Sequence, residues 1–508
     1  MGVIIKQSIK GTLVNYIGVA IGFVTTFFVI THYLTQEEVG LTRVLVDAAV
    51  LFSSFAQLGT ASSIIRFFPY FKDEEGKNHG FFFWTMVVPI VGFLVFWLIF
   101  MLLKRPIVGM FSQKSPLFVN YFRFVIPMGL FMLYQSVFEA NANVLMRIVV
   151  PKFVREVGVR LGLLVCYLLY GNHIITLDGL VIGFCITYFI AALIDIIYLF
   201  TLQRISLKPD LKYITKPLAK DFLFYTMFLV LAAIAGTVTP LLSSFFVSAK
   251  MGLAYTGIYA IANYIATVIE IPNRSLNAIA NPQISEAVKN EDWVRAENLC
   301  KNVSLHLFLS SLFIFFIIWI NVDLLFMILQ NGKDYEAGKT VIFILGLARL
   351  TNSAFSPGIS PLSYSKYYYM TLVFTILLTT STILLNIWLI PTYGMNGSAF
   401  ANFGSYLIYF LLLLALVKWK LNISIFSWGQ LKSLVVVLAL FGLNTLWTRT
   451  LSPLFAMLPV KAVFFTLADC LLKTAVLVSI GVVAVYYWRI SPEVNGLIRK
   501  YTGKLFHR

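Results

Sequence analysis

The sequence predicts an all-α polytopic membrane protein with about 14 transmembrane helices, and three observations lead to this class. The 508 residues are 59% hydrophobic and 12% charged, whereas soluble domains carry roughly 25% charged residues. The mean hydropathy is +0.86. Apolar stretches of about 20 residues, long enough to cross a bilayer as helices, fill nearly the whole chain. Backbone polar groups in lipid must be paired within their own segment, so we expect these stretches to be helical.

The expected spans are joined by turns that are too short to form separate domains. In order, they are 10–33, 41–68, 80–103, 117–140, 154–171, 179–202, 221–248, 254–280, 303–330, 340–364, 368–390, 396–417, 432–448 and 463–487. Some of them contain proline, as at Pro89 and Pro240. Proline leaves backbone groups that neighbours or water must satisfy, so we expect bends at these positions.

The net charge of +17 is distributed unevenly over the turns. Even-numbered turns and both chain ends are rich in Lys and Arg. Odd-numbered turns carry only Lys104, Arg105, Lys114, Lys250, Lys333, Lys339, Arg449 and Lys461. Because Lys and Arg resist translocation, the rich side is cytoplasmic, and both termini should lie there. This bias and attraction to anionic lipid headgroups account for the charge, so no nucleic-acid partner is expected.

The chain also shows signs of an internal repeat. Gly179 and Gly397 each open an expected span and lie 218 residues apart, and the tripeptide FFV recurs at the same offset at 27–29 and 245–247. Gly40 and Gly257 correspond at an offset of 217. Six spans is an even number, so such a repeat would be parallel, as in many transporters. The alternative is chance matching of apolar residues.

The repeat predicts four parts: a six-helix lobe at 1–202, a basic cytoplasmic linker at 203–220, a second six-helix lobe at 221–420, and two extra helices with a basic cytoplasmic tail at 421–508. The linker has Lys or Arg at every fourth residue from Arg204 to Lys220, which favours a strap on the membrane surface.

Motifs of catalytic or metal-binding chemistry are not found in the sequence. There is no GxxxxGK[ST] loop, no HExxH and no CxxC pair, and the expected outer turns are shorter than about 20 residues, too short for an enzymatic domain. We therefore expect a transporter that uses no cofactor or metal, and not an enzyme.

Ionisable residues inside the expected spans are costly and usually functional. Three pairs are spaced four residues apart, which also suits structural ion pairs within one helix: Arg43 with Asp47, Glu270 with Arg274, and Asp469 with Lys473. Glu139 and Asp195 are further buried carboxylates. Asp47, Glu270 and Glu139 are the candidates for ion coupling or ion pairing.

Arg66, Arg123 and Arg349 have no such local partner. An arginine in a low-dielectric cavity suits a phosphate ligand, because its planar guanidinium offers bidentate donors and a permanent charge. Together with Arg43 they are the candidate substrate-binding residues. Arg43 and Arg66 have the alternative of reaching to the membrane interface. For Arg349 the alternative is a structural ion pair with Glu270 or Glu139.

Several segments resemble the prokaryotic oligosaccharide (Wzx-type) flippases of the MOP (MATE-like) superfamily. These segments are YLTQEEVG at 33–40, LG at 58–59, IIRFFP at 64–69 and LIPTYGMNGSA at 389–399. The resemblance implies a V-shaped molecule of two six-helix bundles with a central cationic cavity. Of the candidate arginines, only Arg66 lies in a matching motif.

The resemblance further implies that the protein moves an undecaprenyl-pyrophosphate-linked oligosaccharide across the bacterial cytoplasmic membrane. The partners would be this polyprenyl-linked glycan, membrane lipids and a glycan polymerase, and the protein is expected to be a monomer. A cation-coupled multidrug antiporter and a lipid II flippase, both from the same superfamily, are the alternatives, and a membrane-embedded glycan-processing enzyme is disfavoured by the short outer turns.

Overall fold

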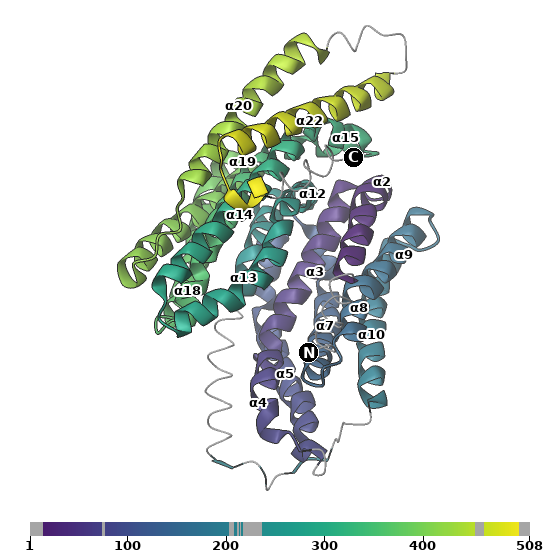
Figure 1. Ribbon diagram of the computed structural model, residues 1–508. Helices are drawn as coiled ribbons and strands as arrows, with labels where there is room; N and C mark the ends of the chain where they lie inside the picture. The colour runs from purple at the N-terminus through teal and green to yellow at the C-terminus, as the bar shows by residue number, and fades with distance from the viewer. Residues whose placement is uncertain are drawn as a thin grey trace. The chain divides into compact units, whose positions relative to one another are not determined.

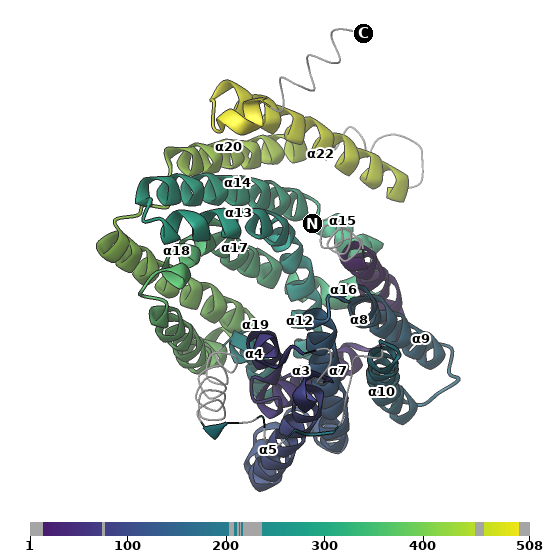
Figure 2. The same cartoon turned by 60° about the horizontal axis from the view of Figure 1, so that its bottom comes forward.

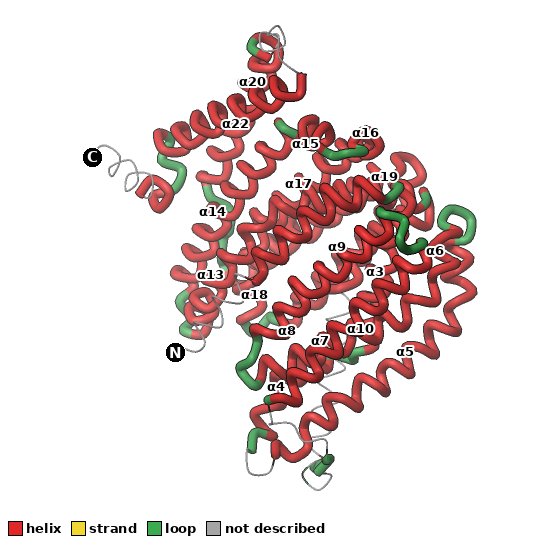
Figure 3. Tube along the Cα trace, turned by 90° about the vertical axis from the view of Figure 1, so that its right-hand side faces the viewer, coloured by secondary structure: helices red, strands yellow, loops and turns green. Residues whose placement is uncertain are grey.

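The computed structural model describes residues 14–73, 77–202, 208–210, 213, 215–216, 236–452 and 462–496. Within these ranges every regular element is a helix and none is a strand (Figures 1 and 3). The predicted all-α class is therefore confirmed.

Nine helices in the described ranges are long and apolar enough to cross a membrane. They are Val14–Tyr33, Gln36–Phe71, Asn78–Phe111, Pro116–Val144, Leu177–Thr201, Trp293–Ile320, Tyr369–Leu421, Trp428–Thr450 and Thr466–Tyr487. The 53-residue helix Tyr369–Leu421 contains two expected spans and is kinked at Gly394, whose φ is 59°. The chain is thus a multi-pass membrane protein.

Four of the expected spans are not among these nine apolar helices. Those at 154–171, 254–280 and 340–364 are helical but are not among the nine. They are also the spans that contain Arg155, Glu270 and Arg349, together with many other polar residues. Most of 221–248 lies outside the described residues, as does most of the predicted linker, so the two predicted lobes remain a prediction.

By its internal contacts the chain divides into two units, Met1–Ala260 and Ile261–Arg508. The first contains η1 (Thr25–Ile30), α2 (Thr31–Tyr33), α3 (Gln36–Ala56), α4 (Thr60–Phe71), η2 (Lys77–Gly80), α5 (Phe81–Phe111), α6 (Pro116–Tyr121), η3 (Phe122–Phe124), α7 (Val125–Val144), α8 (Val149–Phe153), η4 (Val154–Gly158), α9 (Val159–Gly171) and α10 (Leu177–Thr201). Helix α12 (Leu253–Thr267) crosses the boundary between the units.

Helix α7 is central to the first unit, because it packs against α3, α4, α5 and α10. Aromatic residues fill much of this core. Phe52 contacts Phe100 edge-on, and Phe100 stacks on Phe122 with ring centroids 4.5 Å apart. Helix α3 begins at a capping box, in which Thr35 and Glu38 each accept a hydrogen bond from the other's backbone amide. It ends before Leu58 and Gly59, whose positive φ angles separate α3 from α4.

The backbones of α3 and α12 approach each other very closely within the first unit. A Cβ atom at Gly40 would collide with the carbonyl group of Leu253, and one at Gly257 with that of Gln36. The two contacts are equivalent at the 217-residue offset that relates Gly40 to Gly257. Small residues permit such close contact between membrane helices, and this explains glycine at both positions.

The second unit contains η5 (Val268–Glu270), α13 (Ile271–Lys289), α14 (Trp293–Ile320), α15 (Val322–Ile328), α16 (Gly332–Tyr335), η6 (Glu336–Gly338), α17 (Lys339–Phe355), η7 (Ser356–Gly358), α18 (Ile359–Tyr364), α19 (Tyr369–Leu421), α20 (Trp428–Thr450) and α22 (Ala462–Tyr487). Helix α14 packs against α13, α17 and α20, and α17 packs against α19. Helices α20 and α22, the two extra C-terminal spans of the sequence analysis, lie side by side (Figure 2).

Candidate functional site

A polar cluster surrounds Arg349 in the second unit. Its Nη1 atom lies 3.2 Å from Glu270 Oε2, and its Nη2 atom donates to Asn263 Oδ1 at 3.0 Å. Asn352 donates to the other carboxylate oxygen of Glu270 at 2.7 Å. The side chains of Arg349 and Glu270 are only 17% and 18% exposed. Arg349 is therefore paired in this structure, as the alternative in the sequence analysis allowed.

Local helix geometry brings these four residues together. Arg349 and Asn352 are three residues apart in α17 and so lie on one face of it. Glu270 ends the 3₁₀ turn η5, directly before α13, which has a proline near its start. This turn joins α12, which carries Asn263, to α13. The asparagines Asn263 and Asn352 were not among the predicted site residues, although their polarity inside expected spans was a usable signal.

Although the Arg349–Glu270 pair has no net charge, its guanidinium can still bind an anion. Arg349 offers a planar set of donors, and Glu270 holds it in place without a covalent or metal link. A bound dianionic phosphate could take over these donors from Glu270, since guanidinium binds phosphate and carboxylate in the same bidentate way. The predicted Glu270–Arg274 pair is not tested, because the side chain of Arg274 lies outside what the structure describes.

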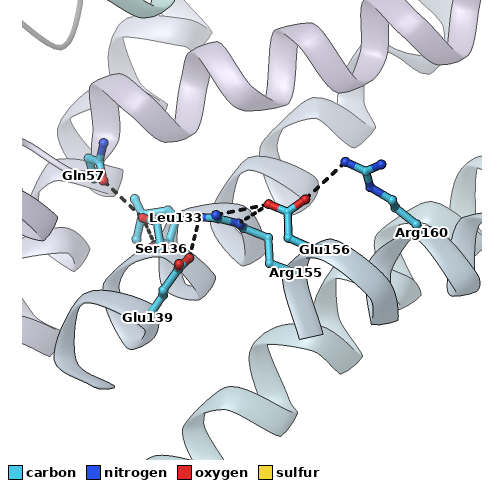
Figure 4. Close-up of polar contacts among 7 residues, drawn as sticks. All are labelled: Gln57, Leu133, Ser136, Glu139, Arg155, Glu156 and Arg160. Atoms are coloured by element: carbon cyan, nitrogen blue, oxygen red, sulfur yellow. Dashed lines mark hydrogen bonds and ion pairs between the residues drawn. The ribbon is translucent and has the colours of Figure 1, made fainter. Parts of the chain in front are cut away.

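A second network of charges lies in the first unit (Figure 4). Arg155 bridges two carboxylates: its guanidinium lies 2.6 Å from Glu139 Oε2 and 3.2 Å from Glu156 Oε1. Glu156 in turn contacts Arg160 at 3.2 Å. Arg160 also donates to the carbonyl oxygen of Gly18 at 2.5 Å. Glu139 was predicted as an ion-pair residue, and the structure gives its partner as Arg155 in place of Arg349.

The remaining predicted residues lie apart from these two networks. Arg43 pairs with Asp47 at 2.9 Å, as predicted, and the buried Asp47 also forms a hydrogen bond with Ser244. Arg66 in α4 and Arg123 in η3 are exposed. Each guanidinium lies over the ring of the next residue, Phe67 at 5.6 Å and Phe124 at 5.1 Å.

The described part of the chain contains no group of three His, Cys, Asp or Glu side chains placed to hold a metal ion. The long apolar helices define the class of protein, a multi-pass membrane protein, and paired ionisable residues lie in its more polar helices. Charges in such positions are typical of transport pathways.

The chain belongs to the family of polysaccharide biosynthesis proteins, because the model of this family matches residues 4–288. Among curated proteins no sequence matches this chain.

Solved structures share the fold at low sequence identity. A lipid II flippase, MurJ, in an inward closed conformation is 14% identical with a TM-score of 0.66; the match covers 94% of this chain and 98% of MurJ. An inward-facing multidrug resistance MATE family transporter of the MOP superfamily is 12% identical with a TM-score of 0.58, covering 80% and 94% of the two chains. A MATE transporter from Vibrio cholerae is 12% identical with a TM-score of 0.53, covering 83% and 99%. The predicted MOP-superfamily fold is thus confirmed.

Proposed function

We propose that this protein is a flippase that moves an undecaprenyl-pyrophosphate-linked oligosaccharide from the inner to the outer leaflet of the bacterial cytoplasmic membrane by alternating access. Family membership supports a role in polysaccharide biosynthesis, and a fold shared with a lipid II flippase supports lipid-linked transport. The protein acts as a transporter without catalytic chemistry of its own. Both termini lie in the cytoplasm, the glycan is handed to a polymerase, and the protein works as a monomer.

The observation that carries this proposal is the hydrogen-bonded pair of Arg349 and Glu270. A half-buried guanidinium needs a hydrogen-bond acceptor in every state. Without substrate this acceptor is Glu270, and with substrate it is the diphosphate of the lipid carrier. Asn352, which donates to Glu270 at 2.7 Å, keeps the displaced carboxylate hydrogen-bonded. The exchange avoids leaving a bare charge in a low-dielectric site.

The proposal assigns unequal roles to the candidate arginines. Arg349 contacts the diphosphate directly. Arg66 and Arg123, which are exposed and lie over aromatic rings, supply additional positive charge that attracts the anionic carrier. Arg43 is already satisfied by the buried Asp47 and acts mainly as its counter-ion. The alternative, a cation-coupled multidrug antiporter, should have a carboxylate-centred cation site, whereas Asp47 and Glu270 are each paired with an arginine.

Variants of Arg349 and Glu270 test the proposal in cells that depend on this protein for glycan export. Arg349→Ala should abolish export while the protein level in the membrane stays near normal. Arg349→Lys should restore only part of it, because a point charge cannot reproduce bidentate contact. Glu270→Gln should retain export, since the amide still accepts a hydrogen bond and the guanidinium is free for phosphate.

A purely structural ion pair gives a different pattern. Removing one partner of a buried pair costs about 3–5 kcal/mol, so Arg349→Ala and Glu270→Ala would each lower the amount of folded protein. If the double variant Arg349→Ala/Glu270→Ala is both folded and active in export, Arg349 does not bind the diphosphate. Mass spectrometry of lipids that co-purify with the wild type identifies the carrier independently, and a drug-like ligand in its place would favour the antiporter.

A further inference from the structure

Asp195 in α10 is fully buried, with 0% of its surface exposed. Neither of its carboxylate oxygens has a hydrogen-bond partner among the described residues. The other acidic residues discussed above all have partners: Asp47 has Arg43, Glu139 has Arg155, and Glu270 has Arg349. An unpartnered carboxylate at membrane depth is costly and is usually functional, so Asp195 needs a physical explanation.

The surroundings of Asp195 are apolar. Ala192 and Leu199, on the same face of α10, belong to a buried cluster with Phe138 and Ala142 of α7. The hydroxyl group of Tyr134, which packs against this cluster, donates to the backbone carbonyl of Met86 at 3.1 Å. The cluster therefore supplies no set of oxygen ligands. A hard metal cation takes about six oxygen ligands, so a metal ion does not suit this position.

Helix α10 packs against α7, α8, α9, η3 and η4. These elements carry the ionisable side chains Arg123, Tyr134, Glu139, Lys152, Arg155, Glu156, Arg160, Cys166, Tyr167 and Tyr170. Of these, Glu139 and Arg155 act on Asp195 electrostatically, with opposite signs. Arg155 is already held by two carboxylates, Glu139 at 2.6 Å and Glu156 at 3.2 Å. These two carboxylates therefore largely neutralise the positive charge of Arg155. The negative charge of Glu139 disfavours a second carboxylate anion at Asp195.

We propose that Asp195 is a proton-binding site, and that its carboxyl group carries a proton in the conformation seen here. Burial in an apolar cluster disfavours the charged form of a carboxyl group. A proton is the one cation that needs no further ligands, so it suits a carboxyl group with no hydrogen-bond partner among the described residues.

Release of this proton has a defined acceptor and consequence. When water reaches Asp195, the carboxyl O–H bond breaks, the proton passes to a water molecule, and a carboxylate remains. The cation that acts on it electrostatically is Arg155, which then exchanges its partner Glu139 for Asp195. Arg155 lies in η4, a π-helical turn at Val154–Gly158, and such turns are frequent at functional sites. Proton binding therefore controls which carboxylate holds Arg155. That this controls transport rests on the proposed function, whereas proton binding itself does not.

Labelling with dicyclohexylcarbodiimide tests the proposal on the purified full-length protein. This reagent modifies protonated carboxyl groups in apolar surroundings, and mass spectrometry of peptides identifies the modified residue. We expect Asp195 to be labelled at neutral pH, and the labelling to be lost as the pH rises. Asp178 is the internal control, because it lies at the other end of the same helix and accepts a hydrogen bond from Tyr121 at 2.6 Å. It should stay unlabelled.

Two results would overturn the proposal. One is that Asp195 stays unlabelled at every pH, in a sample whose cooperative thermal unfolding transition shows that the protein is folded. The other is equal labelling of Asp195 and Asp178. The measurement uses the wild-type protein, so it does not depend on whether a variant folds. Asp195→Asn, which mimics the protonated state, should then remove the pH dependence of glycan export while Asp178→Asn retains it. If Asp195 is labelled but glycan export by the Asp195→Asn variant keeps the pH dependence of the wild type, Asp195 binds a proton and this binding is not coupled to transport.

Discussion

Alanine at Gly257 or Gly40 should force α3 and α12 apart. An added Cβ at Gly257 would lie 3.0 Å from the carbonyl carbon of Gln36, and one at Gly40 would lie 2.7 Å from that of Leu253, with the carbonyl oxygens nearer still. Carbon atoms in favourable contact are about 3.5–4.0 Å apart. The helices must therefore separate by roughly 0.5–1 Å or more, because backbone atoms cannot rotate away as side chains do.

The cost of this separation can be estimated. Overpacking a well-packed interior typically costs about 1–3 kcal/mol. In a domain of 150–250 residues, about 1 kcal/mol lowers the unfolding temperature by roughly 2–4 °C. Thermal unfolding of the purified protein in detergent, followed by tryptophan fluorescence, should show a fall of several degrees for Gly257→Ala and for Gly40→Ala.

Gly109→Ala is the matched control, because Gly109 is a helical glycine with nothing within 4 Å of an added Cβ. Alanine there should leave the unfolding temperature unchanged or raise it, since alanine favours helix by about 1 kcal/mol. The double variant Gly40→Ala/Gly257→Ala should cost clearly less than the sum of the single variants, because the same separation relieves both collisions. Additive effects, or single variants that unfold like Gly109→Ala, would refute the close backbone contact.

Two more predictions follow from the helix ends and the charge distribution. Thr35→Ala removes one half of the capping box at the start of α3 and should destabilise the protein by about 1 kcal/mol, measured by the same unfolding assay. Thr176→Ala, at the start of α10, should do the same. Topology reporters fused at Gln36 and Asn172 should report the outer side of the membrane, and one fused at Lys212 the cytoplasm. An outer reading at Lys212 would contradict the predicted topology beyond the sixth span.

Much of the fold could be predicted because it depends on local composition. Apolar length alone located the helices that are confirmed as candidate spans. The start of α3 was missed by five residues, because its capping box and first turn lie in the segment expected between the first two spans. The offset between Gly40 and Gly257 was also visible in the sequence. Its physical meaning, a close approach of two backbones, was not, because a contact between distant helices leaves no local periodicity.

The partners of buried charges were harder to predict. Spacing of four residues gave the correct partner for Asp47, since it and Arg43 lie on one face of the same helix, α3. It was wrong for Asp469, which accepts hydrogen bonds from Trp447 at 2.8 Å and Ser452 at 2.7 Å, while Lys473 donates to the carbonyl oxygen of Ile320. In these cases tertiary packing supplied partners that local spacing cannot encode.

The polar spans explain why the substrate site, but not the proton site, is proposed where it is. Helices that face lipid gain from apolar side chains all around, and they contain few charges. Arg349 and Arg155 lie in helical segments that are not among the nine apolar candidates, and each is held by a carboxylate from another element. Asp195 differs because it lies in one of the nine apolar helices, and none of the described residues forms an ion pair or hydrogen bond with its carboxylate. Exchange of partners at Arg349 suits a large anionic substrate, whereas the apolar burial of Asp195 suits a proton. The two proposed sites thus differ in the ligand that each can accept, as a transporter that couples two species requires.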